Sequence, residues 1–417
     1  MDSIHIKGGV ALQGKVRIQG SKNAALPVLA ATLLTKEVSY IRNCPRIADV
    51  YLMISLLGSL GCNVSWEDGG IRVDAGNVCE GEMPAEAIKG MRSSLCLLGA
   101  MLGRCGEIVM EHPGGCIIGE RPIDIHLAAL TRMGVSFKEE EGRLYARAEK
   151  LNGAEITLPF ASVGATENIL LAAVAAEGDT VIKGAAREPE ITALCRYLQC
   201  CGGLIEGIDT DCITVHGGIP LHGGDFCIPA DRIVAGTYLF GCIATGGTVL
   251  LEDAPVKQME AAVELAERMG SKCDDTKEGL FVQSPKRPIL PPVVRTVPYP
   301  GFPTDLQSMA LAAMTVGEGE CIIEETIFEN RFRVVEPLRN MGADIEELDS
   351  KRVLVRGVDE LIGRTVEAVE LRGGAALVLA GLVAQGRTKV TGCSYIYRGY
   401  ENICRDLKEL GARVIIE

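Results

Sequence analysis

The feature that most constrains the fold of this chain is a sixfold internal repeat. A short amphipathic segment ending in an apolar residue and then glycine occurs six times, and the glycines follow one another at intervals of 73, 68, 68, 72 and 69 residues. A run rich in β-forming residues comes after each one. Glycine directly after a helix is a common C-cap, because it adopts the left-handed conformation without strain. The six capping positions are Gly61, Gly134, Gly202, Gly270, Gly342 and Gly411.

Each repeat also contains a second kind of helix. Residues 24–34, 169–176, 235–244 and 375–384 are small and apolar almost all round, which predicts helices buried on every side. A β run such as 247–251 follows each of them. The predicted order of elements in each repeat is therefore helix, strand, loop, helix, strand, strand. Six such repeats predict an α/β fold of two similar domains, each made of three repeated units.

The domain boundary is expected near the middle of the chain, around residues 227–230. An alternating apolar run at residues 4–18 precedes the first full unit, and we expect it to pair with the last one. The chain would then start and end in the same domain. The predicted domains are residues 20–229, and residues 1–19 together with 230–417.

Composition excludes several classes of partner. The net charge of −13 argues against nucleic acid and against an anionic membrane surface. No stretch of eighteen uninterrupted apolar residues occurs, so we expect no membrane span. The sixteen cysteines are scattered and never spaced as C-x-x-C, which is typical of reduced thiols in the cytoplasm. His216 and His222 are the one spaced histidine pair; they lie in a Gly-rich stretch, and we expect no metal and no cofactor.

The segment at residues 111–126 carries the clearest chemical signal. Its sequence Pro113-Gly114-Gly115-Cys116 breaks helix and strand alike, and it places a thiol at the tip of a loop. Arg121 follows five residues later, where its charge could lower the pKa of that thiol or hold an anion beside it. The alternative is a surface turn that happens to carry a cysteine.

Three further motifs place polar groups at predicted helix starts. Lys22 follows a strand and opens a helix, a position suited to anion binding, although a solvated lysine is the simpler alternative. The small-residue loop Ser162-Val163-Gly164 lets backbone N–H groups reach a phosphate, or serves only as an N-cap. Asp305 follows the rigid turn Pro300–Pro303 and is either a helix N-cap or a general base.

Arginines recur near equivalent points of the repeats. Equivalent loops of a repeat architecture converge on one face, so these side chains and Lys22 predict a polyanion site. The arginines concerned are Arg92, Arg121, Arg331, Arg372 and Arg398.

Together these motifs resemble the UDP-N-acetylglucosamine enolpyruvyl transferases, and the resemblance covers essentially the whole chain. It is carried by Gly20-Ser21-Lys22-Asn23-Ala24-Ala25-Leu26-Pro27, Pro113-Gly114-Gly115-Cys116 with Arg121-Pro122, Ser162-Val163-Gly164-Ala165-Thr166, Ala186-Arg187-Glu188-Pro189-Glu190, Phe302-Pro303-Thr304-Asp305, Phe328-Glu329-Asn330-Arg331-Phe332 and Arg398-Gly399-Tyr400-Glu401. The resemblance implies a pair of inverted α/β domains of three units each. It also implies transfer of the enolpyruvyl group of phosphoenolpyruvate to the 3′-hydroxyl of UDP-N-acetylglucosamine with release of phosphate, the first committed step of peptidoglycan synthesis. The expected protein is a monomer or a weak homo-oligomer.

The resemblance also implies roles for individual residues. Cys116 would be the general acid, Asp305 the base, and Lys22 a third catalytic residue. Phosphoenolpyruvate would be held at its phosphate by Lys22, Arg121 and Arg398, at its carboxylate by Arg331 and Arg372, and by Asn23. The implied contacts of the sugar nucleotide are Asn23, Arg92, Arg121, Pro122, Ile123, Asp124, Ile125, Ser162, Val163, Gly164, Asp305 and Ile327.

The chain departs from the family pattern at three places. Tyr395-Ile396-Tyr397 stands where His-Ile-Asp is usual, Glu370 stands where Asp precedes Leu-Arg, and Phe160 replaces a basic residue. Two alternatives therefore stay open. One is a non-catalytic paralogue that binds UDP-N-acetylglucosamine, and the other is a shikimate-type enolpyruvyl transferase.

Overall fold

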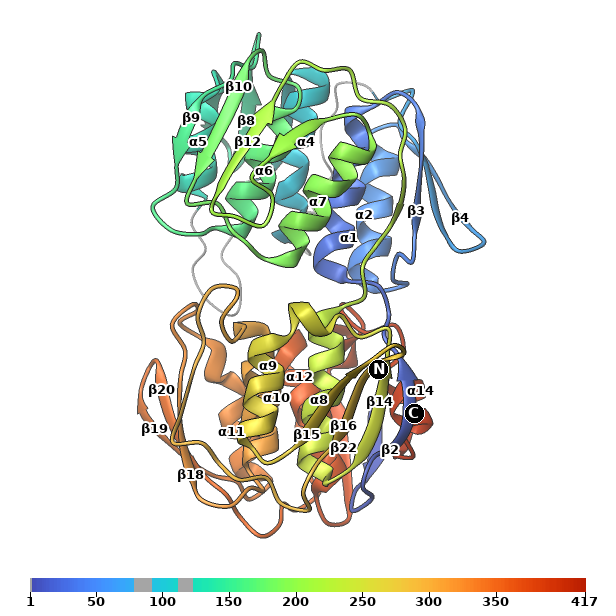
Figure 1. Ribbon diagram of the computed structural model, residues 1–417, viewed down its shortest axis with the longest axis vertical. Coiled ribbons are helices and arrows are strands. Elements are labelled where there is room, and N and C mark those ends of the chain that lie inside the picture. The colour runs from blue at the N-terminus through green and yellow to red at the C-terminus, as the bar shows by residue number, and fades with distance from the viewer. Residues whose placement is uncertain (1, 79–91, 112–122) are drawn as a thin grey trace. The chain divides into compact units, whose positions relative to one another are not determined.

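The computed structural model describes residues 2–78, 92–111 and 123–417 of the chain (Figure 1). The chain forms two compact units. The N-unit is made of the described residues from Gly20 to Pro229, and the C-unit is made of the residues up to Gln19 together with Ala230–Glu417. Each unit has a hydrophobic core of its own.

The N-unit contains three consecutive helix–strand–helix–hairpin repeats. Its helices are α1 (Lys22–Ala31), α2 (Ala48–Ser59), α4 (Cys96–Cys105), α5 (Asp124–Arg132), α6 (Val163–Ala173) and α7 (Pro189–Cys200), with short 3-10 helices η1 (Thr32–Leu34) and η2 (Arg92–Leu95). Its strands are β3 (Val38–Arg42), β4 (Asn63–Glu67), β5 (Gly70–Asp74), β6 (Glu107–Glu111), β7 (Ser136–Glu140), β8 (Arg143–Arg147), β9 (Glu155–Thr157), β10 (Asp179–Lys183), β11 (Leu204–Glu206), β12 (Cys212–His216) and β13 (Asp225–Cys227). Among the described residues they form sheets of order β13-β3-β5-β4, β6-β8-β7 and β11-β12-β10-β9.

The C-unit repeats the same plan. Its helices are α8 (Arg232–Thr245), η3 (Val256–Gln258), α9 (Glu260–Arg268), α10 (Thr304–Met314), η4 (Arg331–Val334), α11 (Val335–Asn340), α12 (Leu371–Val383), α13 (Cys393–Ile396) and α14 (Ile403–Glu409). Its strands are β1 (Ile4–Lys7), β2 (Gln13–Arg17), β14 (Thr248–Glu252), β15 (Lys272–Thr276), β16 (Gly279–Gln283), β17 (Val293–Arg295), β18 (Glu320–Glu324), β19 (Asp344–Asp349), β20 (Arg352–Arg356), β21 (Thr365–Glu367), β22 (Arg387–Thr391) and β23 (Arg413–Ile416). They form sheets of order β15-β16-β14-β2, β17-β18-β20-β19 and β21-β22-β1-β23.

The six glycines that revealed the repeat have the predicted capping conformation. Their φ angles are 97°, 98°, 98°, 91°, 97° and 82° in chain order. Each follows the second helix of its repeat and precedes a strand. The left-handed backbone there is open to glycine at little cost, which explains why this residue marks every repeat. The predicted α/β architecture of repeated units is confirmed.

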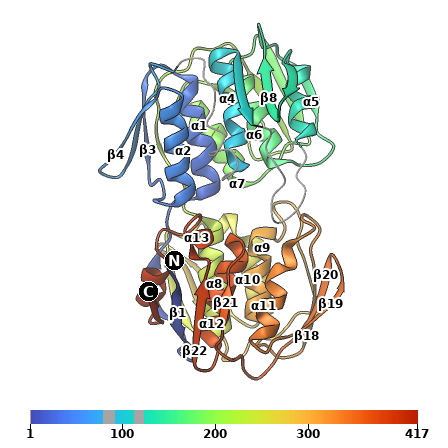
Figure 2. The same ribbon diagram turned by 180° about the vertical axis from the view of Figure 1, so that it is seen from behind.

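The N-terminal segment completes the C-unit. Strand β1 pairs antiparallel with both β22 and β23, so it supplies the hairpin strand that the sixth repeat lacks (Figure 2). The expectation that residues 4–18 pair with the last repeat is confirmed for β1 but is wrong for β2. Strand β2 pairs parallel with β14, in the fourth repeat. In the fifth repeat the same position, beside β18, is taken by β17, which comes from the segment that precedes that repeat.

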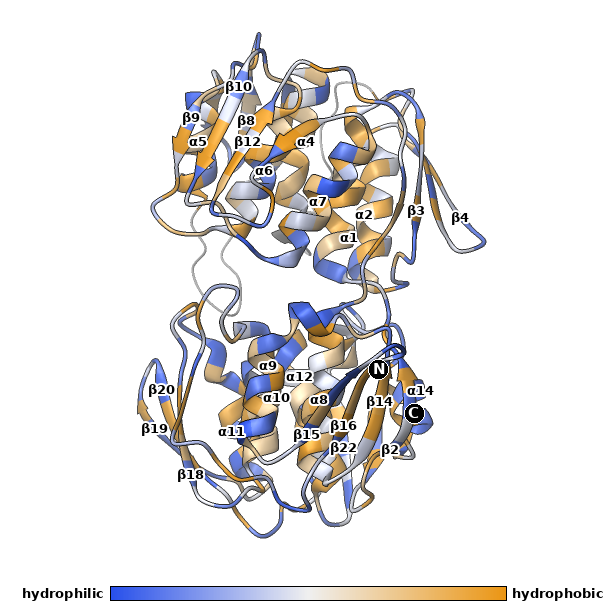
Figure 3. Cartoon of the chain, viewed as in Figure 1, coloured by the Kyte–Doolittle hydropathy of each residue, from blue (hydrophilic) through white to orange (hydrophobic). Residues whose placement is uncertain are grey.

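The first helix of each repeat is buried, as its apolar composition predicts. In α8 and α12 nearly every residue is buried, and Figure 3 shows much of α1 coloured as hydrophobic. Small residues let such helices approach closely. A Cβ added at Gly99 of α4 would lie 2.3 Å from the carbonyl oxygen of Asn168 of α6. The starts of α1, α6, α10 and α12 carry several of the candidate functional residues. No helix within the described residues is long and apolar enough to cross a membrane.

Candidate active site

Asp305 is the centre of an ion-pair network in the C-unit. It is the second residue of α10, and Pro303 is the N-cap, so the interpretation of Asp305 as an N-cap is wrong. Its Oδ1 accepts a hydrogen bond from Nη2 of Arg331 at 2.5 Å, and its Oδ2 accepts one from Nη2 of Arg372 at 2.7 Å. The two arginine side chains are 2% and 5% exposed, whereas the Asp305 side chain is 25% exposed. The structure therefore brings three predicted site residues together.

The arginines decide the ionisation of Asp305. Burial alone favours the neutral acid, but Arg372, Arg331 and then Arg232 outweigh it and hold the pKa of Asp305 well below its usual range. The carboxyl is thus ionised at neutral pH, as a general base requires. A carboxylate held so firmly is also a weak base, because proton uptake would break two charge-assisted hydrogen bonds. Loosening of these bonds by another anion would raise its basicity.

Glu370 caps the helix that carries Arg372. Its side chain accepts from the backbone N–H of Arg372 at 2.8 Å and from that of Gly373, and its Oε2 lies 3.7 Å from Nη1 of Arg331. An N-cap carboxylate satisfies the free N–H groups of the first turn. Glu370, one of the three departures from the family pattern, therefore keeps a carboxylate against Arg331.

Lys22 of the N-unit is paired rather than solvated. Ser21 caps α1 and accepts from the backbone N–H of Ala24, which leaves Lys22 as the first helical residue. The Lys22 Nζ lies 2.6 Å from Oδ2 of Asp49, and the two side chains are 11% and 3% exposed. The solvated alternative for Lys22 is wrong. Next to it, Nδ2 of Asn23 donates to Oε1 of Glu190 at 3.3 Å.

A carboxyl near Glu190 has an unusual ionisation. Burial, together with the charges of Glu190 and Glu188, raises the pKa of Glu167 to about 8. Glu167 lies on α6, and Glu190 lies in the first turn of α7. Three carboxyls therefore interact here, and one of them, Glu190, accepts the hydrogen bond from Asn23.

Two predicted nucleotide-binding segments meet at the starts of α5 and α6. Ser162 caps α6, with the backbone N–H of Ala165 donating to its Oγ at 3.3 Å. A Cβ added at Gly164 would lie 2.9 Å from Nε2 of His126, so the helix that starts at Asp124 approaches this loop closely. Ile123 is buried and Asp124 is exposed, while Ile125 and Val163 are half-buried. The N-cap alternative for Ser162 holds, and the close approach needs a residue without a side chain at Gly164.

The turn that carries Arg398 is held by a residue far away in the sequence. Nε2 of Gln19 donates to the carbonyl oxygen of Gly399 at 3.1 Å, and its Oε1 accepts from the backbone N–H of Glu401 at 2.9 Å. The buried hydroxyl of Tyr400 lies 2.7 Å from Oγ1 of Thr237. The predicted phosphate ligand Arg398 therefore stands on an anchored turn.

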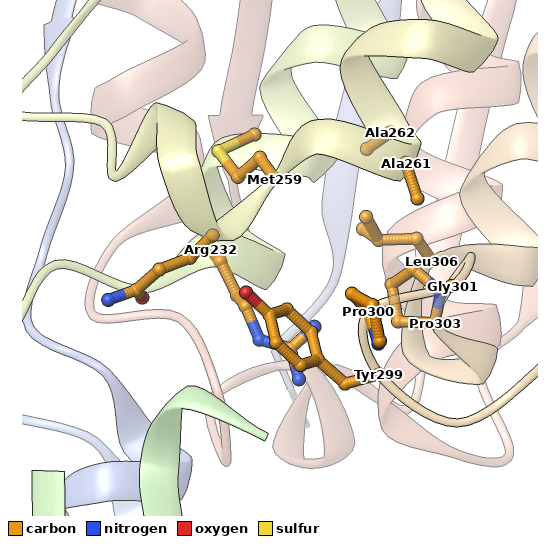
Figure 4. Close-up of a pocket in the computed structure, with 10 residues that line it drawn as sticks. Arg232, Met259, Ala261, Ala262, Tyr299, Pro300, Gly301, Pro303 and Leu306 are labelled. Carbon is orange, nitrogen blue, oxygen red and sulfur yellow. The ribbon is translucent and has the colours of Figure 1, made fainter. Parts of the chain in front are cut away.

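A small pocket in the C-unit lies beside the start of α10. Its wall carries the polar side chains of Arg232 and Gln258, and the guanidinium carbon of Arg232 lies 5.7 Å from the centre of the Tyr299 ring (Figure 4). The residues that line it include Met259, Ala261, Ala262, Pro300, Gly301, Pro303 and Leu306. Arg232 also helps to lower the pKa of Asp305. A third arginine, besides the two that Asp305 contacts, therefore stabilises the ionised form of Asp305.

Comparison with known proteins identifies the family. A family model described as EPSP synthase (3-phosphoshikimate 1-carboxyvinyltransferase) matches residues 6–407. UDP-N-acetylglucosamine 1-carboxyvinyltransferase 2 of Caldanaerobacter subterraneus subsp. tengcongensis is 43% identical over 415 residues, which cover 100% of this chain and 99% of that one. The chain belongs to the enolpyruvyl transferase family. A further enolpyruvyl transferase, the UDP-N-acetylglucosamine 1-carboxyvinyltransferase of Nitratidesulfovibrio vulgaris strain Hildenborough, is 43% identical over 414 residues, 99% of each chain.

Solved structures show the same fold at lower identity. The enolpyruvyl transferase NikO from Streptomyces tendae matches with a TM-score of 0.91 and 24% identity, over 100% of this chain and 99% of that one. EPSP synthase from Acinetobacter baumannii matches with a TM-score of 0.76 and 18% identity over the full length of both chains. The enolpyruvyl transferase fold of the chain is thereby shown.

Some predicted residues of this enolpyruvyl transferase lie outside the described part of the chain. They are Cys116, Arg121, Pro122 and the side chain of Arg92. Ile327 is described, and its backbone N–H donates to Oε1 of Glu325 at 2.8 Å. A contact of Ile327 with a sugar nucleotide would therefore use its carbonyl group or its side chain.

Sequence reasoning missed the acidic and amide partners of the cations. Asp49 carries no local signal, because it pairs with Lys22 from a different helix. Gln19 is likewise remote from Gly399 and Glu401, and Glu325 is remote from the hydroxyls of Thr296 and Thr304. Glu190 belongs to the motif Ala186–Glu190 that marked the family resemblance, and its hydrogen bond to Asn23 shows what that residue does in the fold.

Proposed function

We propose that this enolpyruvyl transferase moves the enolpyruvyl group of phosphoenolpyruvate to the 3′-hydroxyl of UDP-N-acetylglucosamine, the first committed step of peptidoglycan synthesis. The observation that carries the proposal is the 43% identity, over the full length, to a protein named for this sugar nucleotide. The shikimate-type alternative is less favoured, because the EPSP synthase structure is only 18% identical.

The reaction is an addition followed by an elimination. In the addition, the 3′-oxygen bonds to C2 of phosphoenolpyruvate, the hydroxyl loses its proton to Asp305, and C3 gains a proton from Cys116. In the elimination, the bond between C2 and the phosphate oxygen breaks, and the proton on Asp305 passes to the leaving phosphate. C3 returns a proton to the Cys116 thiolate as the double bond is restored. Protons and electrons balance without a cofactor. An ionised Asp305 supports its role as the base.

The cations divide between the two charged groups of phosphoenolpyruvate. We assign the carboxylate to Arg331 and Arg372, whose paired guanidinium groups suit a planar anion. We assign the phosphate to Lys22, Arg121 and Arg398. When the substrate carboxylate draws the two arginines away from Asp305, the pKa of Asp305 rises toward a value useful for a base.

The sugar nucleotide is assigned to a separate set of groups. Backbone N–H groups at the start of α6 suit a diphosphate, because the first turn of a helix presents free donors and the positive end of its dipole. We assign Ser162, Val163 and Gly164 to this role, with Ile123, Asp124 and Ile125 on the neighbouring segment. Asn23, Arg92, Arg121, Pro122, Asp305 and Ile327 complete the proposed set.

We propose that the domains of the enzyme are residues 20–229, and residues 1–19 together with 230–417. A separate hydrophobic core in each compact unit supports this division. The cytoplasmic location and the monomeric or weakly oligomeric state stay predictions from the sequence.

The experiment that tests the function is a phosphate-release assay. The enzyme is supplied with phosphoenolpyruvate and either UDP-N-acetylglucosamine or shikimate 3-phosphate, and Cys116→Ser and Asp305→Ala serve as inactive controls. We expect phosphate only with the sugar nucleotide, and only from the unmodified chain. Release with shikimate 3-phosphate would establish the shikimate-type alternative. Binding of UDP-N-acetylglucosamine without any release would establish the non-catalytic paralogue.

A further inference from the structure

Glu325 is a buried carboxylate whose position links two parts of the proposed site. It directly follows β18, and only 1% of its surface is exposed. Four donors converge on its two oxygens. Oε1 accepts from the backbone N–H of Ile327 at 2.8 Å, from that of Phe328 at 3.1 Å, and from Oγ1 of Thr296 at 2.9 Å. Oε2 accepts from Oγ1 of Thr304 at 2.9 Å.

These contacts close a ring around Asp305 and Arg331. Thr304 precedes Asp305 at the start of α10, and its carbonyl oxygen accepts from Nε of Arg331 at 3.3 Å. Arg331 also donates to Asp305 directly. Arg331 follows the backbone segment whose N–H groups Glu325 holds. The Glu325 carboxylate thus fixes both ends of the Asp305–Arg331 pair, one through Thr304 and the other through Ile327 and Phe328.

The number of donors indicates a positioning role rather than a binding role. Both oxygens of Glu325 accept from the protein: three donors converge on Oε1, and the Thr304 hydroxyl holds Oε2. Because only 1% of the residue is exposed, neither oxygen is open to a substrate group. A buried carboxylate that lost its donors would be strongly destabilising, so these contacts hold Glu325 in place.

We propose that Glu325 is a positioning residue that sets the geometry of Asp305 and Arg331 for catalysis. The inference rests on the proposed roles of those two residues. A base acts efficiently only when it is held within about 0.5 Å of its productive position. A displacement of about 1 Å can lower the rate about a hundredfold. The hydroxyl of Thr304 is the single link from the carboxylate to α10, so its loss should loosen Asp305 without emptying the core.

The test compares two isosteric substitutions, each of which removes one hydroxyl that donates to Glu325. Thr304→Val cuts the link to α10, whereas Thr296→Val cuts a contact on the β17 side and also removes an acceptor used by the backbone N–H of Thr326. We expect Thr304→Val to lower kcat about tenfold, with both KM values within about twofold. Thr296→Val should lower the urea midpoint at least as much, yet keep kcat within about twofold.

Two variants of Glu325 itself complete the test. Glu325→Gln keeps an oxygen for the backbone N–H groups and an amide that can donate to Thr304, so it should retain far more turnover than Glu325→Ala at the same substrate concentrations. In Glu325→Ala, adding Thr304→Val should lower kcat less than it does in the unmodified chain, because the contact between the two residues is already lost. A pure stability role would give losses of kcat that follow the urea midpoint in all four variants.

The outcomes separate this inference from the proposed function. If Asp305→Ala keeps turnover, the assignment of the base fails, whatever the behaviour of Glu325. If Asp305→Ala is inactive while Thr304→Val and Glu325→Ala match Thr296→Val in kcat, the positioning role of Glu325 alone is overturned.

Discussion

Replacement of Asp305 by alanine should destabilise the protein as well as inactivate it. The change leaves Arg331 and Arg372 without their shared carboxylate, and their side chains are 2% and 5% exposed. Removal of one partner of a buried ion pair typically costs about 3–5 kcal/mol. Glu370 stays 3.7 Å from Arg331, and the Asp305 side chain is itself 25% exposed. We therefore expect a loss near the lower end, about 3 kcal/mol.

Urea unfolding with and without added inorganic phosphate measures this effect. Asp305→Ala should lower the unfolding midpoint, and phosphate should restore part of the loss, because an anion can take the place of the missing carboxylate. A ligand at a hundred times its Kd stabilises by about 2.7 kcal/mol. Asp359→Ala is the matched control, since its carboxylate is 93% exposed and pairs with Arg287 at the surface. Such surface pairs contribute at most about 1 kcal/mol.

The pH dependence provides a second readout with a fixed sign. The pKa of Asp305 is lowered in the folded protein, so its contribution to stability is complete above the unfolded pKa of about 3.9. That contribution is lost as the pH falls below this value toward the folded pKa. Asp305→Ala should therefore differ from the unmodified chain most at neutral pH and least in strong acid. Equal midpoints at pH 7, or a larger gain from phosphate in the unmodified chain, would refute the argument.

Three further results are expected. Asp49→Asn should lower the free energy of unfolding by about 3 kcal/mol, because it removes the carboxylate that lies 2.6 Å from the buried ammonium of Lys22, and an unchanged urea midpoint would contradict this. Glu167→Gln should raise the urea midpoint at pH 8 but not at pH 4. The pKa of this carboxyl is raised to about 8 in the folded protein, so its contribution to stability is lost as the pH rises from its pKa in the unfolded chain toward 8. Equal effects at both pH values would contradict this prediction. Fosfomycin, an epoxide analogue of phosphoenolpyruvate, should label Cys116. It should spare buried thiols such as Cys195, because burial raises the pKa of Cys195 to about 12. Peptide mass mapping measures this, and a label mainly on another cysteine would remove Cys116 from the mechanism.

The fold was predictable because its signal is local and repeated. A helix end that needs a left-handed residue specifies glycine at Gly61 and at five equivalent positions, and each can be seen without knowledge of distant contacts. The apolar inner helices were predictable for the same reason. The pairing of β2 was not, because an alternating run shows that a strand exists but not which neighbour it joins.

The site was predictable only in part, because cations are recognised from the sequence more easily than their partners. Lys22 was expected either to be solvated or to await an anion, and the structure instead gives it the carboxylate of Asp49. The choice between N-cap and base for Asp305 depended on two residues of helix register, because Pro303 is the N-cap. No spacing rule relates Glu325 to Thr304, since they meet only after β18 and the start of α10 have packed together.

The paired cations change how substrate binding and catalysis are related. An array of bare arginines and a lysine would attract phosphoenolpyruvate but leave Asp305 unaffected. In the structure the same guanidinium groups that suit the substrate carboxylate hold Asp305 ionised and weakly basic. Under the proposed assignment, each contact that Arg331 or Arg372 transfers to the substrate would weaken its hold on Asp305, and the pKa of Asp305 would rise as the site fills. This coupling follows from the carboxylate shared by the two arginines, which the sequence alone did not reveal.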